Sequence, residues 1–189
     1  MEWKRHPQAL NAVKKLREGG VVACPMEAVW GLSCDPNNET AVQRLLTIKG
    51  RPESKGLILI ADDAERLRPW LGKIQKAEWR RFKEAPNDHP ITWLLPHNEN
   101  VPPFIVGSNE KLAVRLVTHP PAAAVCALFA APLVSTSANP SGMHAANSAS
   151  MVKQYFPHSI ACYCPGEVGN AKSVSEIRDI NTGEILRPR

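Results

Sequence analysis

The sequence lacks any long, uninterrupted hydrophobic run. No stretch approaches the roughly 20 apolar residues that a transmembrane helix needs. The first ten residues, MEWKRHPQAL, also lack the apolar centre of a secretory signal peptide. We therefore expect a cytoplasmic protein that has no membrane partner.

Four common catalytic signatures are absent as well. The chain has no G-x-x-x-x-G-K-[ST] and no G-x-G-x-x-G, so the sequence indicates neither a P-loop nor a dinucleotide-binding fold. It also has no H-E-x-x-H and no G-x-S-x-G, the motifs of zinc peptidases and of serine hydrolases. Any catalytic site must therefore be built from less standard arrangements of residues.

Cysteines are few and do not form a disulfide pattern. The chain has an odd number spread along its length: Cys24, Cys34, Cys126, Cys162 and Cys164. This distribution favours reduced thiols. Cys162 and Cys164 lie in the strand-like segment IACYC, where alternation places both thiols on one face. Because the spacing offers no second cysteine or histidine pair, we expect core packing and predict no metal ligands.

The overall composition is that of an ordinary globular protein. A chain of 189 residues suits one domain, which we place at 1–189. Hydrophobic residues make up 43% and charged residues 22%, without the excess of polar residues that marks disorder. The formal net charge of +5 favours anionic partners, either a polyphosphate substrate or RNA.

Apolar periodicity predicts helices that alternate with short buried strands. The expected helices are 6–20, 37–50, 63–71, 75–84, 120–130 and 148–156. The expected strands are 21–25, 56–61, 91–96, 111–117, 132–138 and 160–164. Asn181-Thr182-Gly183 should join the last two strand-like runs into a hairpin. This order predicts an α/β protein with a mixed sheet.

Two polar clusters flank expected strands. Lys49, Arg51 and Lys55 fall within seven residues directly before the strand GLILIA. The strand PLVSTSANPSG ends in hydroxyl and amide side chains, among them Ser135, Ser137 and Asn139. Taken alone, the first cluster is more commonly a solvated loop, and the second is more commonly a turn capped by its own side chains.

Two arginines lie inside apolar, strand-like segments. Arg115 interrupts LAVRLV and Arg187 interrupts EILRPR. A buried arginine needs an anion or a carboxylate, and a structural ion pair with Glu27 or Asp179 would account for one of them. Two such arginines together with a polar strand end suggest a cradle for phosphate and ribose at the end of the sheet.

Taken in order, these motifs resemble the YrdC-like threonylcarbamoyl-AMP synthases in their short, single-domain bacterial form. The resemblance extends from about Val21 to the C-terminus through PMEAVWGLSCDP, KGRPESKGLILIA, LAVRLVTHP, PLVSTSANPSG, SEIRD and LRPR. The fold that it implies is a twisted, open α/β sheet with flanking helices around a basic concave cleft.

The resemblance also implies a reaction. L-threonine, bicarbonate and ATP would be condensed to threonylcarbamoyl-AMP and pyrophosphate, with Mg²⁺ assisting, by a nucleotidyltransferase. Other tRNA-modification proteins would use the product to make N6-threonylcarbamoyladenosine, and tRNA or double-stranded RNA would bind the basic surface.

Site residues follow from the resemblance motif by motif. The catalytic residues would be Lys49 and Arg51. The residues in contact with ATP or the adenylate would be Arg51, Lys55, Ser137, Asn139 and Arg187. The residues around threonine would be Ser135, Arg115, Ser175 and Met26.

The chain departs from the family pattern at several positions. Met26 stands where a threonine is usual, Asp88-His89 where Pro-Gly is usual, Ser33 where glycine is usual, and Lys111 where a small hydroxyl residue is common. Met26 and Asp88-His89 favour an alternative function, that of a catalytically weak or inactive relative that binds tRNA or double-stranded RNA. A protein that senses nucleotide without turnover is a third reading.

Overall fold

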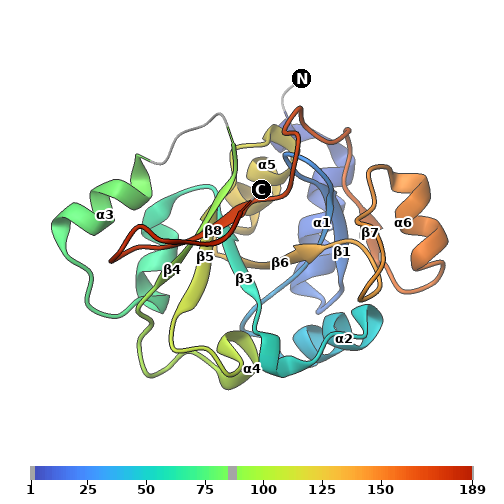
Figure 1. Cartoon of the computed structure of the whole chain (residues 1–189). Coiled ribbons are helices and arrows are strands. Elements are labelled where there is room, and N and C mark those ends of the chain that lie inside the picture. Colours follow the sequence, from blue (N-terminus) through green and yellow to red (C-terminus); the bar gives the residue numbers. More distant parts are fainter. Residues whose placement is uncertain (1–2, 85–88, 189) are drawn as a thin grey trace.

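The computed structural model describes residues 3–84 and 89–188, whose backbone forms one twisted, mixed sheet with helices around it (Figure 1). The strands are β1 (Val22–Pro25), β2 (Trp30–Cys34), β3 (Ile58–Ala61), β4 (Ile91–Leu95), β5 (Leu112–Leu116), β6 (Leu133–Ser137), β7 (Cys162–Tyr163), β8 (Glu176–Asp179) and β9 (Ile185–Arg187). Their order in the sheet is β7-β1-β2-β6-β3-β5-β4-β8-β9. Three neighbouring pairs are parallel, β1 with β7, β3 with β5 and β4 with β8.

Helices of two kinds connect the strands. The α-helices are α1 (Pro7–Arg17), α2 (Glu39–Lys49), α3 (Lys76–Lys83), α4 (Pro103–Val106), α5 (Pro120–Phe129) and α6 (Ala149–Tyr155). Short 3₁₀ helices are η1 (Trp3–Arg5), η2 (Glu53–Lys55) and η3 (Ala64–Trp70). Each helix of the described residues is too short or too polar to span a lipid bilayer.

Local signals set the ends of the helix that leads into the first polar cluster. The Asn38 side chain accepts a hydrogen bond from the Ala41 N–H and caps the start of α2. Gly50 ends the helix in the left-handed conformation at φ 59°, which glycine adopts without a steric penalty. The chain therefore turns sharply between Lys49 and Arg51, and the two cations leave the helix in different directions.

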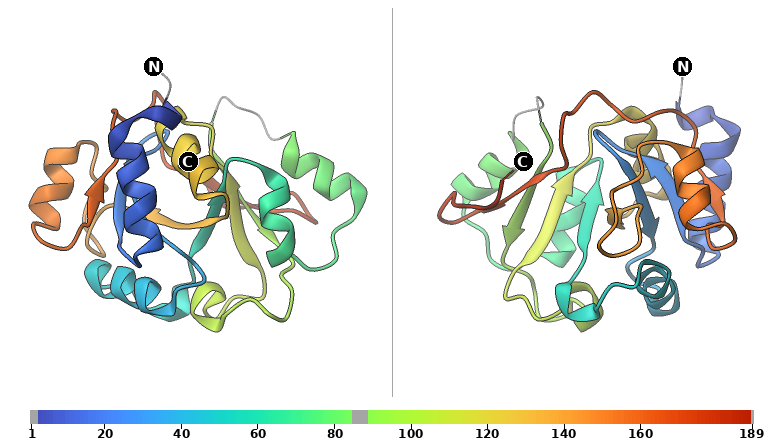
Figure 2. Two further views of the ribbon diagram at one scale, coloured as in Figure 1. Left: turned by 180° about the vertical axis from the view of Figure 1, so that it is seen from behind. Right: turned by 45° about the vertical axis from the view of Figure 1, so that its right-hand side comes forward.

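Helices α1 and α5 pack together on one face of the sheet, as the rear view in Figure 2 shows. Side chains of β3 and β6 alternate between this face and the opposite one. Ile60 and Leu133 join the apolar cluster under α1 and α5, whereas Leu59 and Val134 belong to the larger cluster on the other side. The central strands are thus buried on both faces, which explains their unbroken apolar sequences.

The C-terminal hairpin lies at the far edge of the sheet from β7. Strands β8 and β9 are antiparallel, and β8 pairs in parallel with β4. In Figure 1 the turn of this hairpin reaches towards α3, while α6 lies at the other end of the sheet near β7. The hairpin therefore extends from α3, at its turn, to the middle of the molecule, at its open end (Figure 1).

The structure confirms the predicted α/β class and most of the expected elements. It differs at 63–71, which forms the 3₁₀ helix η3 with Pro69 inside it instead of a regular α-helix. Proline lacks the N–H that an α-helix needs at this point. The sequence analysis also gave no element to β2 or to α4. The turn at 181–183 is confirmed, with Gly183 at φ 75° and its N–H bonded to Asp179 O.

Candidate active site

One cleft of the described structure collects most of the predicted site residues. Its volume is about 330 Å³. Eight of the ten predicted residues line it: Met26, Arg51, Arg115, Ser135, Ser137, Asn139, Ser175 and Arg187. The other two, Lys49 and Lys55, lie outside the lining. Clusters that are far apart in the sequence therefore converge in space, although their roles stay predictions.

The register of the sheet explains the convergence. Gly31 of β2 pairs with Ser137 of β6, and Ile58 of β3 pairs with Ser135. The first residues of β2 and β3 thus meet the last residues of β6. Ser135 and Ser137 share a face with Leu133, because alternate residues of a strand point the same way. Leu133 is packed in the core while the two serines line the cleft, so the cleft begins where the core under α5 ends.

Three arginines give the cleft its charge. Arg51, Arg115 and Arg187 all line it, against one carboxylate, Glu27. Burial lowers the pKa of Arg51 and of Arg187, and the neighbouring arginine lowers each further: Arg187 for Arg51, and Arg115 for Arg187. Because an arginine side chain carries a positive charge in proteins, three of them make the cleft strongly attractive to an anion.

Arg115 and Glu27 form a loose buried pair. The Arg115 Nη1 atom lies 3.6 Å from Glu27 Oε2, and both side chains are nearly nine-tenths buried. Neither Arg115 Nε nor Glu27 Oε2 makes a hydrogen bond within the described residues. The sequence analysis named Glu27 as a possible structural partner, and the structure confirms that pairing. These two atoms therefore keep hydrogen-bonding capacity that a ligand or an ordered water could use.

Arg51 also shapes its own loop. Its Nε and Nη2 atoms donate to Gly56 O at 3.1 and 2.9 Å, and Nη2 reaches Lys55 O at 3.3 Å. These bonds close the loop from Arg51 to Gly56 and hold the guanidinium plane in one orientation. Lys55 is exposed at the end of η2, on the same loop. A fixed arginine with an exposed lysine nearby suits a ligand that has several negative charges.

Lys49 does not line the cleft, but it bonds to two residues that do. Its side chain is buried, and Nζ donates to Ser137 O at 2.6 Å, Asn139 O at 2.8 Å and Asn139 Oδ1 at 3.0 Å, with Ser137 Oγ at 3.3 Å. Burial, followed by repulsion from Arg51, lowers the pKa of Lys49 to about 8. The ammonium group therefore ties the end of β6 to the end of α2. This geometry supports a positioning role, which differs from the catalytic role that we predicted.

Asn139 is fixed on both sides. Its Oδ1 accepts from Lys49, while its Nδ2 donates to Pro140 O and to Met143 O. The turn that it stabilises brings Met143 and Ala145 into the lining. Leu57 and Val174 add to this apolar part of the cleft. Sequence reasoning missed these apolar residues, because single hydrophobic residues in loops carry no distinguishing pattern.

Ser175 and Arg187 are joined at the mouth of the hairpin. Arg187 Nη2 donates to Ser175 O, and the Ser175 hydroxyl lies 2.8 Å from Thr92 Oγ1 on β4. β9 itself is exposed, which corrects the premise that Arg187 interrupts a buried strand. A short apolar run at a sheet edge looks like a buried strand in sequence, but only one of its sides is paired.

The departures from the family pattern fall in different places. Met26 lines the cleft, is 4% exposed, and packs beside Gly31. Ser33 is buried in β2. His89 lies with Nε2 3.4 Å from Glu176 Oε1, and Asp88 lies outside the described residues. Met26 is thus the departure that contacts the cleft directly.

The cleft offers little to hold a metal ion by itself. Among residues 3–84 and 89–188, no group of three or more His, Cys, Asp or Glu side chains could hold one. Glu27 is the one carboxylate of the cleft lining, and it already faces Arg115. Because Mg²⁺ in nucleotide sites is bound by one or two carboxylates plus substrate phosphates, this lining fits Mg²⁺ only when a polyphosphate brings it.

Comparisons with known proteins agree on one family. Residues 14–188 match the model of the Sua5/YciO/YrdC family, described as "Telomere recombination". The chain is 47% identical over 177 residues to a threonylcarbamoyl-AMP synthase of Halorhodospira halophila, covering 94% of this chain and 92% of the relative. It is 40% identical over 189 residues to the enzyme of the same name from Cellvibrio japonicus, covering 100% and 99%.

Solved structures give the same result. Sua5 of P. abyssi, in a crystal structure with L-threonine, has a TM-score of 0.86 and 32% sequence identity. That match covers all of this chain and 54% of Sua5, so the chain corresponds to about half of that protein. YciO of E. coli has a TM-score of 0.80 at 21% identity, covering 96% of this chain and 90% of YciO, which supports the fold.

Proposed function

The chain belongs to the Sua5/YciO/YrdC family, and from that premise we infer that it is a threonylcarbamoyl-AMP synthase. Its reaction joins L-threonine and bicarbonate into a carbamate with loss of water. The carbamate oxygen then attacks the α-phosphorus of ATP, and pyrophosphate leaves. One observation supports placing this reaction in the cleft. Arg51, Asn139 and Arg187 are far apart in the sequence, yet all three line it.

The nucleotide would occupy the side of the cleft near β6 and the 51–56 loop. Arg51 and Arg187 would pair with phosphate oxygens, and the exposed Lys55 would reach the terminal phosphates. Ser137 and Asn139 would position the adenylate through their polar side chains. The apolar lining at Leu57, Ala145 and Val174 offers a surface for the adenine base.

Threonine would occupy the side near β5 and the β1–β2 turn. Arg115 offers a guanidinium group to the carboxylate, and Glu27 accepts a hydrogen bond from the Thr118 N–H on the same side. Ser135 and Ser175 supply hydroxyl groups, and Met26 replaces the hydroxyl that the family usually has. We therefore propose that this chain holds the threonine side chain through packing more than through hydrogen bonds.

Catalysis at such a site consists mainly of positioning. Adenylate formation needs no covalent enzyme intermediate, so the cleft has to hold the carbamate oxygen in line with the α-phosphorus. Positioning of reactants supplies on the order of 7–11 kcal/mol in favourable cases. The fixed arginines would stabilise the charge that grows on the departing pyrophosphate. Bound Mg²⁺ would neutralise further phosphate charge.

Partners and location are parts of the same proposal. The product would pass to other tRNA-modification proteins, and the basic surface would accept tRNA or double-stranded RNA. The five cysteines are free thiols in the structure, which supports a reducing, cytoplasmic setting. The comparisons do not favour the alternative of an inactive RNA-binding relative, because the matched relatives carry the enzyme's name.

One assay tests the function directly. Purified protein is incubated with ATP, Mg²⁺, L-threonine and labelled bicarbonate, and the products are separated by chromatography. We expect pyrophosphate and labelled threonylcarbamoyl-AMP, both dependent on threonine. Absence of both products, together with salt-sensitive tRNA binding, would support the alternative instead.

A further inference from the structure

Strand β9, which places Arg187 in the cleft lining, has few packing contacts. It ends the sheet and pairs with β8 alone within the described residues. Ile185 and Leu186 are about half exposed, so β9 is not held by core packing. The register between β8 and β9 also shifts between Ile177 and Arg178. Besides the bond from Arg187 Nη2 to Ser175 O, the position of Arg187 therefore depends on how firmly the turn of the hairpin is fixed.

The turn of the hairpin is ordered by Asp179. Its Oδ1 atom accepts hydrogen bonds from the Asn181 and Thr182 N–H groups, and its backbone pairs with Glu184 and Gly183. An aspartate that caps two N–H groups in this way fixes the backbone of a turn. These bonds therefore restrict the backbone of the hairpin from Asp179 to Glu184.

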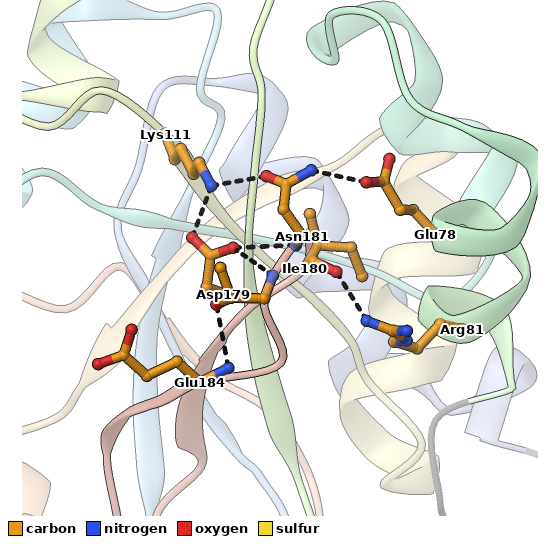
Figure 3. A network of polar contacts seen from close by, with 8 residues as sticks. Glu78, Arg81, Lys111, Asp179, Ile180, Asn181 and Glu184 are labelled. Carbon is orange, nitrogen blue, oxygen red and sulfur yellow. Dashed lines mark hydrogen bonds and ion pairs between the residues drawn. The ribbon is translucent and has the colours of Figure 1, made fainter.

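Two other parts of the molecule bind that turn, as Figure 3 shows. Lys111, directly before β5, donates to Asp179 Oδ2 at 2.6 Å and to Asn181 Oδ1 at 2.7 Å. From α3, Glu78 accepts from Asn181 Nδ2 at 2.6 Å, and Arg81 donates to Ile180 O at 2.9 Å. We call Glu78, Arg81, Lys111, Asp179 and Asn181 the turn network.

The turn network is partly shielded from solvent. The side chains of Lys111 and Asp179 are 28% and 14% exposed. Burial alone would raise the pKa of Asp179, but the bonds from Lys111 and from the Thr182 and Asn181 N–H groups outweigh it and lower the pKa. Asp179 therefore stays ionised at neutral pH, and its contact with Lys111 is less screened by salt than a fully exposed contact.

We propose that the turn network is a positioning device for catalysis, which fixes the hairpin from its turn and so holds Arg187 in the cleft. Lys111 and Asn181 are positioning residues, because they act through the hairpin and lie outside the cleft lining. The functional part of this inference rests on the proposed synthase activity. It gives Lys111, a departure from the family pattern, a role particular to this chain.

The global fold has other supports. Helix α3 is anchored by Trp79 and Phe82 in the core, and the buried Ile180 continues the pairing of β8 with β4 through its bond to Leu94 O. Loss of one polar contact from the network should therefore change the position of the hairpin more than the stability of the whole protein. This difference separates positioning from a merely structural role.

A double-mutant cycle tests the inference. Lys111→Met and Asn181→Ala are each made in the wild-type and in the Arg187→Ala background, and the dissociation constant of ATP is measured by calorimetry. We expect either variant to weaken ATP binding about five- to tenfold in the wild-type background, and less than about twofold once Arg187 is absent. Equal losses in both backgrounds, or no loss in the wild-type background, would overturn the inference.

Hydrogen exchange gives a readout that does not depend on activity. We expect faster amide exchange of 185–187 in Lys111→Met than in Lys76→Met, a control at an exposed lysine at the start of α3. Unchanged exchange would contradict the inference. If the wild-type protein makes no threonylcarbamoyl-AMP, the proposed function fails, while the exchange of 185–187 still decides whether the network holds the hairpin.

Discussion

At the scale of single residues, Arg51 has two roles: it holds the 51–56 loop closed and it adds positive charge to the cleft. We expect Arg51→Ala to raise the KM for ATP by about tenfold or more, because a charged hydrogen bond contributes roughly 1.5–3 kcal/mol. The melting temperature should change little, since the residue lies in a loop. Steady-state kinetics with varied ATP measure the effect, and Arg80→Ala, at an exposed position of α3, is the control. Unchanged kinetics would remove Arg51 from the site.

The ammonium group of Lys49 predicts a dependence on pH. Its pKa of about 8 lies below its ordinary value of 10.5. Above pH 8 the neutral amine has fewer N–H donors for the four oxygens around it, so Ser137 and Asn139 lose their fixed positions. We expect kcat/KM for ATP to fall with a midpoint near pH 8.

A loss of stability caused by Lys49 cannot explain this expected fall in kcat/KM. Between pH 8 and 10.5 the unfolded chain holds this proton while the folded chain has released it. The contribution of Lys49 to the free energy of unfolding therefore rises with pH in this window. A pH profile combined with melting curves separates the two effects, and a profile that stays flat to about pH 9.5 would contradict the assignment.

Met26 predicts a gain on substitution. We expect Met26→Thr to lower the KM for L-threonine by about threefold to tenfold, because the new hydroxyl restores a hydrogen-bonding group in the cleft. Loss of packing against Gly31 should reduce the free energy of unfolding by about 1–2 kcal/mol. Kinetics with varied threonine provide the measurement. If the threonine dependence does not change, Met26 is remote from the amino acid.

At the scale of elements, the loop between α2 and β3 depends on Gly56. Its φ is 61°, and a Cβ atom there would lie 2.5 Å from Val106 O. We expect Gly56→Ala to lower the free energy of unfolding by about 1–3 kcal/mol, and to weaken ATP binding because Gly56 O holds the Arg51 side chain. Urea denaturation measures the first effect.

Gly142→Ala is the matched control for this prediction. Gly142 also has a positive φ, 84°, but a Cβ atom there would have open space around it. Its substitution should therefore cost only the conformational strain, about 1 kcal/mol. Similar losses for the two variants would mean that the contact with Val106 is unimportant.

Sequence patterns predicted the elements with strong periodicity and missed those without it. Helices α1 and α2 follow apolar spacing with clear caps, and the C-terminal turn follows from Asn181-Thr182-Gly183. Strand β2 was missed because WGLSC contains glycine and serine, and its strand form depends on pairing with β1 and β6 on both sides. Propensity alone cannot predict pairing between segments far apart in the chain.

The site shows the same division. The order of the motifs identified eight residues that line one cleft, because a resemblance to a family also implies that family's fold. It could not separate Lys49 from Arg51, since the two cations are neighbours in sequence. Only the turn at Gly50 leaves Lys49 buried outside the lining while Arg51 lines the cleft. The contacts of Lys111 likewise depend on the pairing of β4 with β5 and with β8, which brings the start of β5 beside the hairpin turn.

At the scale of the whole molecule, the buried thiols test whether the chain unfolds as one domain. Burial raises the pKa of Cys24, Cys34 and Cys126, so native thiols should react slowly with alkylating reagents. We expect all three to become reactive at the same urea concentration, because they lie in cores that share one sheet. Mass spectrometry after brief alkylation measures this. Separate midpoints would indicate independent folding units.

One face of strands β3 and β6 contributes to both the hydrophobic core and the cleft. Ile60 and Leu133 fill the core beneath α5, and one step further along the same face Ile58 and Ser135 line the cleft. Substitutions made at Ile60 or Leu133 for heat tolerance would therefore displace Ile58 and Ser135, which line the proposed substrate cleft. Thermostability and turnover in this protein should be screened together, since neither can be altered there without disturbing the other.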